Sequence, residues 1–237
     1  MVSCTLVWVP SSELNNLHNT LFRKQKVKYR TVRLREQSTD LFLHVENVRE
    51  NRYGIYASGF FDKVLTLYNV DEGEFQVKIS EPFDVQLYSK DPENPNLLGI
   101  FARRENAEDL VNSLKLKINW IIFNLDEGYE KIRSSSSFQD VKVLRFERIV
   151  DRYITTATLG GRRILHSPLV DYFSKRLRGK IYALALVFRS RWVKVYFYGH
   201  IYAPARMPST RESFVLDLYK ELKKLNIVLK ESIDIFF

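Results

Sequence analysis

Alternation of apolar and polar positions along the first hundred residues predicts mainly β-structure. Residues 2–9 form an apolar run typical of a strand, and leucines at 14, 17 and 21 then recur at helical spacing. After that helix the alternation returns, and strands are expected at 27–35, 41–48, 53–60, 63–70, 74–79, 83–88 and 97–102. Strands this closely spaced, separated by turn residues, predict an antiparallel meander.

The second half repeats this mixture of strands and helices. A helix is expected over 105–120, and Ser167-Pro168 supplies an N-cap and a first-turn proline for another helix that ends at Gly179. Ser209-Thr210-Arg211-Glu212 matches a capping box that begins a third helix. Strands are predicted at 141–150, 152–159, 162–166, 180–188 and 191–203, with short ones at 227–229 and 233–237.

A serine-rich stretch suggests where the chain divides. Residues 133–139 contain four consecutive serines and are predicted to be a linker between two lobes. Residues 1–132 would form an N-terminal α+β lobe, and residues 140–237 a basic C-terminal α+β lobe. The predicted fold class is therefore α+β, with two lobes of mainly antiparallel sheet, each finished by a helix packed on it.

Two similar segments of the sequence raise the question of a pseudo-repeat. Leu98-Gly99-Ile100-Phe101-Ala102 and Tyr198-Gly199-His200-Ile201-Tyr202-Ala203 each precede a predicted helix, at an offset of 100 residues. Identity is confined to a few positions, so two unrelated strand-to-helix junctions are an equal alternative.

Composition narrows the class of protein. The chain of 237 residues is 45% hydrophobic and 14% aromatic, which is typical of an ordered globular protein. Its single cysteine, Cys4, excludes an intrachain disulfide and favours an intracellular location. No signal peptide is evident, and no apolar run approaches the 18 to 20 residues of a membrane span, so no membrane partner is expected.

The net charge of +9 is unevenly distributed and points to an anionic partner. Residues 1–35 carry a net charge of +6, and residues 36–140 carry −8. Residues 141–237 contain 19 Lys or Arg against eight Asp or Glu, a net charge of +11. The excess of positive charge therefore lies in the C-terminal region.

The predicted strand 191–203 has one aromatic face that also carries a lysine and a histidine. Val193, Val195 and Phe197 alternate with Trp192, Lys194, Tyr196, Tyr198, His200 and Tyr202, so the first set faces a core and the second faces the other way. That second face can be covered by a helix of the same chain, by a partner protein, or by nucleic acid whose bases stack on the rings.

Basic residues near this strand favour nucleic acid. Arginine turns beside one sheet suit phosphate, because the guanidinium group binds phosphate oxygens bidentately. The basic end of the capped helix has a sufficient structural reason, since positive charge is favourable at a helix C-terminus. The candidate nucleic-acid-binding residues are Arg162, Arg163, Lys175, Arg176, Arg178, Arg189, Arg191, Trp192, Lys194, Tyr196 and Tyr198.

A second basic run lies near the N-terminus. Lys26, Lys28 and Arg30 share one face of the predicted strand 27–35 and form a charged edge. This edge either continues the same binding surface or meets the acidic middle segment, in this chain or in a second copy.

Signals for catalysis are weak, and the chain is expected not to be an enzyme. The four histidines show no metal-ligand spacing, and no phosphate loop, dinucleotide-binding turn or nucleophile elbow occurs. The acidic clusters at 71–74 and 126–130 have unconvincing spacing for a Mg²⁺ nuclease. No metal and no cofactor is expected.

The sequence thus predicts a non-catalytic protein that binds DNA or RNA through the basic, aromatic surface of its C-terminal lobe. The alternative is a scaffold or interaction subunit of a multiprotein complex or homo-oligomer, in which the aromatic face is buried against another protein. Low-salt binding to nucleic acid and mass in solution distinguish the two.

Overall fold

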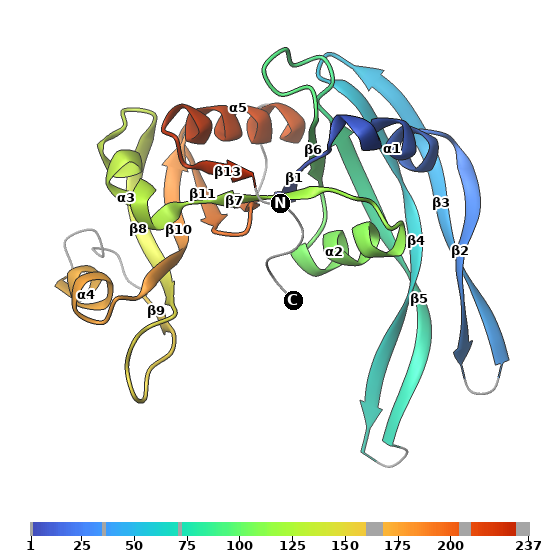
Figure 1. Cartoon of the computed structure of the whole chain (residues 1–237), viewed down its shortest axis with the longest axis horizontal. Helices are drawn as coiled ribbons and strands as arrows, with labels where there is room; N and C mark the ends of the chain where they lie inside the picture. The colour runs from blue at the N-terminus through green and yellow to red at the C-terminus, as the bar shows by residue number, and fades with distance from the viewer. Residues whose placement is uncertain (1, 35–36, 71–72, 160–167, 204–209, 231–237) are drawn as a thin grey trace. The chain divides into compact units, whose positions relative to one another are not determined.

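The computed structural model describes residues 2–34, 37–70, 73–159, 168–203 and 210–230, and it confirms the α+β class. Antiparallel strands and helices form two compact units (Figure 1). The N-terminal unit is Val7–Asn119, and the C-terminal unit combines Met1–Leu6 with Trp120–Phe237. None of the helices among the described residues has both the length and the apolar character needed to cross a bilayer.

The N-terminal unit is a meander of long strands with two helices. Its strands follow one another in the sheet as β2-β3-β4-β5-β6, each antiparallel to the next. The elements are a short 3₁₀ helix Ser11–Glu13, α1 Leu14–Leu21, β2 Gln25–Leu34, β3 Gln37–Asn51, β4 Gly54–Asn69, β5 Gly73–Leu87, β6 Leu97–Ile100 and α2 Arg104–Ser113.

The C-terminal unit is built on a second antiparallel arrangement, in the order β1-β12-β11-β10-β8-β9, and β7 pairs with β13. Its first strand comes from the start of the chain, where Cys4 pairs with Ile201. The elements are β1 Val2–Trp8, β7 Asn119–Phe123, α3 Leu125–Ser134, β8 Phe138–Glu147, β9 Ala157–Thr158, α4 Pro168–Asp171 with a π-helical turn Tyr172–Arg176, β10 Lys180–Phe188, β11 Arg191–Tyr196, β12 His200–Ala203, α5 Arg211–Lys224 and β13 Val228–Lys230.

Each unit has its own core on one side of its strands. In the N-terminal unit, Leu43, Phe61 and Phe83 are buried together with Leu17 of α1 and Leu110 of α2. In the C-terminal unit, the Phe188 ring lies 5.5 Å from Phe214 of α5 and 5.6 Å from Phe138. These contacts show that α5 packs on the apolar side of β8 and β10.

The two units divide at residues 119 and 120, whereas composition places the linker at 133–139. The serine-rich segment lies inside the C-terminal unit, between α3 and β8, where Ser137 donates to Glu221 of α5 at 2.9 Å. The pseudo-repeat is not confirmed. Gly99 lies within β6, but Gly199 lies in a turn with a φ of +71°, so the two glycines have different structural roles.

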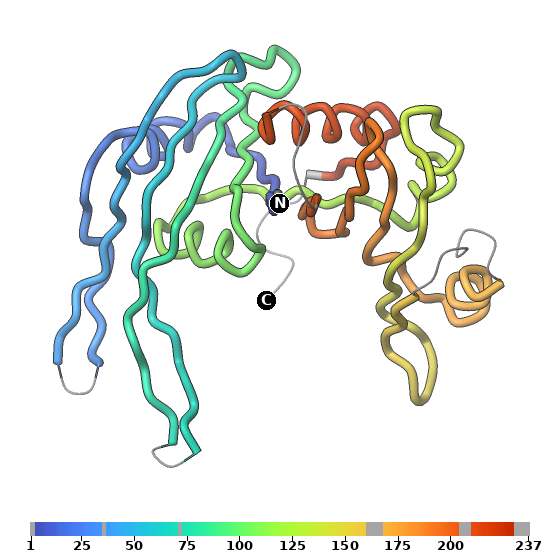
Figure 2. The backbone as a smooth tube through the Cα atoms, turned by 180° about the vertical axis from the view of Figure 1, so that it is seen from behind, coloured from blue at the N-terminus to red at the C-terminus, as the bar shows by residue number. Residues whose placement is uncertain are grey.

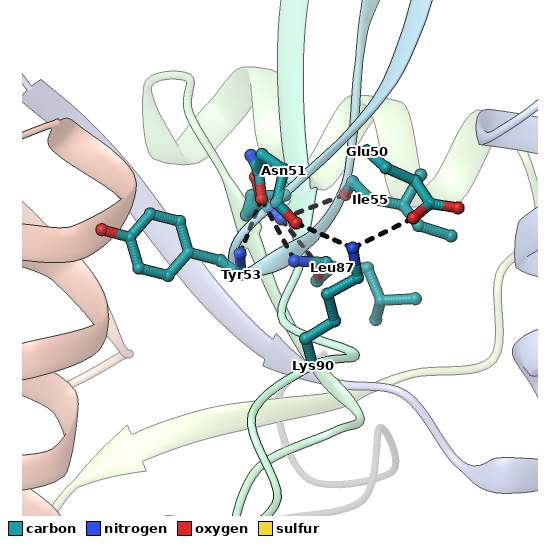
Figure 3. A network of polar contacts seen from close by, with 8 residues as sticks. Glu50, Asn51, Tyr53, Ile55, Leu87 and Lys90 are labelled. Carbon is teal, nitrogen blue, oxygen red and sulfur yellow. Dashed lines mark hydrogen bonds and ion pairs between the residues drawn. The ribbon is translucent and has the colours of Figure 1, made fainter.

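The turn between β3 and β4 is held by a polar network around Asn51 (Figure 3). The Asn51 side chain accepts hydrogen bonds from the N–H groups of Tyr53 at 2.9 Å and Gly54 at 3.1 Å, and it donates to buried Gln86 at 2.6 Å. Lys90 donates to the Asn51 carbonyl and pairs with Glu50 at 3.0 Å. Gly54 has a φ of +142°, and a Cβ there would lie 2.2 Å from the Leu87 carbonyl oxygen.

At the end of the β3-β4 pairing opposite to this turn, the N-terminal sheet forks. Pairing of β3 with β4 ends at Leu43 and Phe61, and the hairpins β2-β3 and β4-β5 then run on separately as two-stranded ribbons (Figures 1 and 2). Asp62 lies at the fork, 8% exposed. Its carboxylate accepts from the Phe42 N–H at 3.0 Å and Ser80 at 2.6 Å, and it pairs with Lys78 at 2.8 Å.

Candidate functional site

The residues of the predicted aromatic strand lie on the half-exposed side of the C-terminal sheet. Val193 and Val195 of β11 are fully buried on the side that α5 covers. Of the residues that alternate with these valines, Trp192 is 43% exposed, Lys194 is exposed and Tyr196 is half-buried. The strand predicted as continuous over 191–203 is broken after Tyr196, yet β12 pairs back on β11 and keeps the same face.

A tight turn at residues 197–199 brings the rings on this face together. Gly199 has a φ of +71°, and a Cβ there would lie 2.2 Å from the carbonyl oxygen of Ile121 in β7. Only glycine fits this turn without moving the backbone of β7. Because of the turn, Tyr198 stacks against Tyr196 with ring centroids 5.5 Å apart, and against His200 at 6.0 Å.

The central strand β10 adds a third tyrosine through an irregularity in its pairing. The register of β10 against β8 shifts between Ile181 and Ala183, as it does at a β-bulge. A bulge re-aims the side chain at the extra residue. Tyr182 therefore joins the face, with its ring 5.3 Å from Tyr198 and 6.4 Å from Tyr196.

Three cations reach over rings of this face. Lys142 Nζ lies 4.8 Å from the ring centroid of Trp192, the Arg145 guanidinium carbon lies 5.1 Å from Tyr182, and Lys194 Nζ lies 5.6 Å from Tyr202. We call this surface the aromatic-basic face, defined by Lys142, Arg145, Tyr182, Trp192, Lys194, Tyr196, Tyr198, His200 and Tyr202.

Strand β10 lies between β8 and β11. Its small side chains explain how side chains of β8 and β11 can contact each other across it. Ala185 pairs with Lys142 of β8 and with Lys194 of β11, and Ala183 pairs with Arg145 and Tyr196. Both alanines are more than nine-tenths buried. Long side chains from the flanking strands therefore extend across β10 and cover it.

The charges of the three cations are neutralised to different degrees. Arg145 Nη2 lies 3.0 Å from Glu147, whose side chain is 28% exposed. Within the part of the chain that the structure describes, neither Lys142 nor Lys194 forms an ion pair. Burial raises the pKa of the Tyr196 hydroxyl above its ordinary value of 10.0, so this ring is neutral at physiological pH.

His200 anchors the face to the first strand. Its ring is buried, with Nδ1 3.0 Å from the Thr5 hydroxyl and Nε2 3.2 Å from the Ser3 hydroxyl. Both ring nitrogens are thus engaged with β1, which fixes the ring under Tyr198. His200 is part of the framework that positions the tyrosines.

The other candidate residues form contacts with residues outside this face or are simply exposed. Arg189 pairs with Asp217 of α5 at 2.5 Å, on the helix side of the sheet, and Lys175 pairs with Asp171 at 2.9 Å. The Arg176 guanidinium lies 5.7 Å from the Tyr172 ring, and Arg178 is exposed.

Arg191 is exposed where β11 begins, beside Trp192 in the chain. Arg162 and Arg163 lie outside the described residues.

Sequence reasoning missed Lys142, Arg145 and Tyr182 as members of the site. The strand over 141–150 was predicted, but its register against β10 and the bulges near Ala183 and Leu144 were not. Tyr182 in particular alternates with Ile181 and Ala183, which assigns it to the core side of a regular strand. The signal for Lys142 was the alternation Val141-Lys142-Val143. It places the lysine on one face of the strand and two buried valines on the other face.

The described residues offer little for metal chemistry. Among them, no group of three or more His, Cys, Asp or Glu side chains lies close enough to hold a metal ion. In the acidic cluster at 126–130, Asp126 pairs with Lys180 at 2.8 Å and accepts from the Ile181 N–H, which gives it a structural role.

Comparison with protein-family models, with curated protein sequences and with solved structures finds no match. The aromatic-basic face is therefore the feature on which a functional conclusion depends.

Proposed function

We propose that the protein binds nucleic acid through the aromatic-basic face and catalyses no reaction there. The observation that supports this proposal is the pairing of three cations with three half-exposed rings, at 4.8 to 5.6 Å, on one side of one sheet. Nucleic acid presents what such a surface recognises, namely flat bases and regularly spaced phosphates.

A phosphate group binds a cation more strongly than an aromatic ring does. A cation over an exposed ring contributes only about 0.5 to 1 kcal/mol. A hydrogen bond between a cation and a phosphate oxygen is charge-assisted and about twice as strong as a neutral one. Lys142 and Lys194, which form no ion pair among the described residues, are free to exchange a ring contact for a phosphate contact.

The roles of the residues follow from their chemistry. Lys142 and Lys194 engage phosphates, and Arg145 adds a weaker contact because it already pairs with Glu147 at 3.0 Å. The rings of Trp192, Tyr182, Tyr198 and Tyr202 provide surfaces on which bases stack. Arg191 is exposed but pairs with Phe188 on the α5 side of the sheet, so it is not assigned to the aromatic-basic face. Arg189 is assigned to the fold, because it lies on the α5 side of the sheet, where its guanidinium pairs with Asp217.

Salt dependence tests this proposal. Each neutralised phosphate contributes a slope of about −0.7 for single strands and −0.9 for duplex DNA in a plot of log K against log salt concentration. Two full contacts and a weaker third therefore predict a slope of about −1.4 to −2.7, measured by fluorescence anisotropy of labelled oligonucleotides. Absence of binding to both single-stranded and duplex probes at 20 mM salt would refute the proposal.

A second candidate function is a subunit of a protein assembly, and one observation favours it. On the β4-β5 ribbon, Leu65 pairs with Val77 and Leu67 with Phe75, so four apolar side chains share one face. Leu65 and Leu67 are each 38% exposed. An apolar ribbon face of this kind suits association with another protein.

Mass in solution tests this second candidate. Self-association through the ribbon predicts a species larger than 28.0 kDa by light scattering, returned to the monomer by Leu65→Asp with Leu67→Asp. A 28.0 kDa species at every concentration tested would exclude self-association.

A further inference from the structure

The aromatic-basic face has the spacing of a surface for unstacked bases. Side chains on one face of a strand recur every two residues, which is about 6.7 Å along the strand. On β11 this interval separates Trp192 from Lys194 and Lys194 from Tyr196, so the two rings lie two intervals apart. Bases stacked in one strand of a duplex are only about 3.4 Å apart. Bases can match the interval on this strand only if they are drawn apart.

Duplex geometry also hides the part of a base that these rings would contact. Inside a double helix each base is covered on both faces by its neighbours, and only its edges are exposed in the grooves. The rings of the aromatic-basic face lie on one side of a sheet of several strands. This is the geometry of a platform on which unpaired bases stack.

The pairing of rings with cations repeats in a way that fits consecutive nucleotides. Each of the three pairs joins one ring, suited to a base, and one cation, suited to the adjoining phosphate. The three pairs come from four successive strands of the sheet, β12, β11, β10 and β8. They join Lys142 of β8 with Trp192 of β11 across β10, Arg145 of β8 with Tyr182 of β10, and Lys194 of β11 with Tyr202 of β12.

From this arrangement we infer that the ligand is single-stranded nucleic acid, held as a run of about three nucleotides with unstacked bases. The inference rests on the proposed function and deepens it. Recognition is tolerant of sequence, because every base has a face that can stack on a ring. Both DNA and RNA strands satisfy this chemistry.

The test compares three fluorescein-labelled probes on the full chain: a dT12 strand, a U12 strand, and a blunt 12-base-pair duplex without single-stranded ends. The expected result is that at least one of the two strands binds at least tenfold more tightly than the duplex. Trp192→Ala should weaken binding of that strand by about 5- to 150-fold, the loss of one stacked base. It should change binding of the duplex much less.

Two control variants make the result specific. Trp192→Phe keeps a flat ring and should restore most of the affinity lost in Trp192→Ala. Tyr153→Ala removes a ring that is 83% exposed in the loop between β8 and β9, and it should leave binding of both probes unchanged. Circular dichroism and thermal melting establish that each variant is folded, which is expected because Trp192 is 43% exposed.

The outcomes separate this inference from the proposal beneath it. Equal or tighter binding of the duplex, with Trp192→Ala without effect on either strand, overturns the inference and leaves nucleic-acid binding intact. Absence of binding to all three probes instead defeats the proposed function itself.

Discussion

At the scale of single residues, the environment of each basic side chain decides what it can bind. Arg189 and Lys194 differ by five positions, yet Arg189 pairs with Asp217 at 2.5 Å whereas Lys194 lies over the Tyr202 ring. A cation that already has a carboxylate gains less from a phosphate than one that has only a ring. Local neutralisation therefore distinguishes residues that composition treats as equal.

This difference leads to a paired prediction. Lys142→Gln combined with Lys194→Gln should make the slope of log K against log salt shallower by about 1.4 to 1.8, because two phosphate contacts are lost. Arg189→Gln should leave that slope unchanged, although it removes the same kind of charge from the same unit. Salt titrations of the three proteins with one labelled strand measure this. Equal changes in slope for both variants would show that charge acts through the whole molecule.

At the scale of elements, the fork of the N-terminal sheet depends on one carboxylate. Burial alone would raise the pKa of Asp62, but hydrogen bonds from Lys78, Ser80 and the Phe42 N–H together hold it below its ordinary value of 3.8. A lowered pKa means that folding favours the ionised form. The stabilisation is therefore present above pH 3.8 and is lost as the pH falls through the lower pKa of the folded state.

The neutral variant Asp62→Asn should reproduce that loss at pH 7. Charge-assisted hydrogen bonds contribute about 1.5 to 3 kcal/mol, so hydrogen exchange within residues 62–80 should quicken while exchange in β10 stays unchanged. Glu74→Gln is the matched control, since it removes an exposed carboxylate from the same ribbon. Unaltered exchange in Asp62→Asn would mean that strand pairing alone holds the fork.

Elements were predictable from sequence wherever local chemistry is decisive. The meander, helix α5 and strand β10 follow from periodicity and turn signals. The N-cap of α5 is Thr210, which accepts from the Ser213 N–H, one residue after Ser209, the cap of the predicted capping box, which lies outside the described residues. The helix predicted over 105–120 was wrong beyond Ser113. Lys115 adopts a φ of 51° that ends it, and the apolar run that follows is strand β7. Short apolar runs fit either structure by periodicity alone.

Helix α3 was missed although its signal was present. Asn124 accepts a hydrogen bond from the Glu127 N–H, and Asp126 and Glu127 lie in the first turn, where acidic residues are favourable. In contrast, the strands predicted over 53–60 and 63–70 form one strand, β4, and those over 74–79 and 83–88 form one strand, β5. Gly59 and Pro82 are residues that usually interrupt a strand. Both residues pair across long ladders here, Gly59 with Phe83 and Pro82 with Phe60.

At the scale of the whole molecule, sequence could not show which distant segments combine. The first six residues belong to the C-terminal unit, where Thr5 pairs with His200 almost two hundred positions away. No local pattern encodes that pairing. The aromatic face was nevertheless evident from alternation within one strand, whereas the cations of β8 became part of it only through the pairing of β8 with β10.

The same reasoning predicts where the ligand will leave its footprint. If binding depends on side chains gathered by the C-terminal sheet, a saturating dT12 strand should slow hydrogen exchange in β8, β10, β11 and β12. Strands β4 and β5 should exchange as in the free protein, because their cations are engaged elsewhere, as Lys63 is with Asp109 at 3.0 Å and Lys78 with Asp62 at 2.8 Å.

The basic run at 23–35 provides the sharpest contrast with the aromatic-basic face. Lys28 is already paired with Asp40 at 2.9 Å, so Lys28→Gln should weaken binding less than Lys194→Gln. Protection of β2 and β3 with no change in β11 would place the ligand on the N-terminal unit instead, since net charge alone does not decide between two basic surfaces.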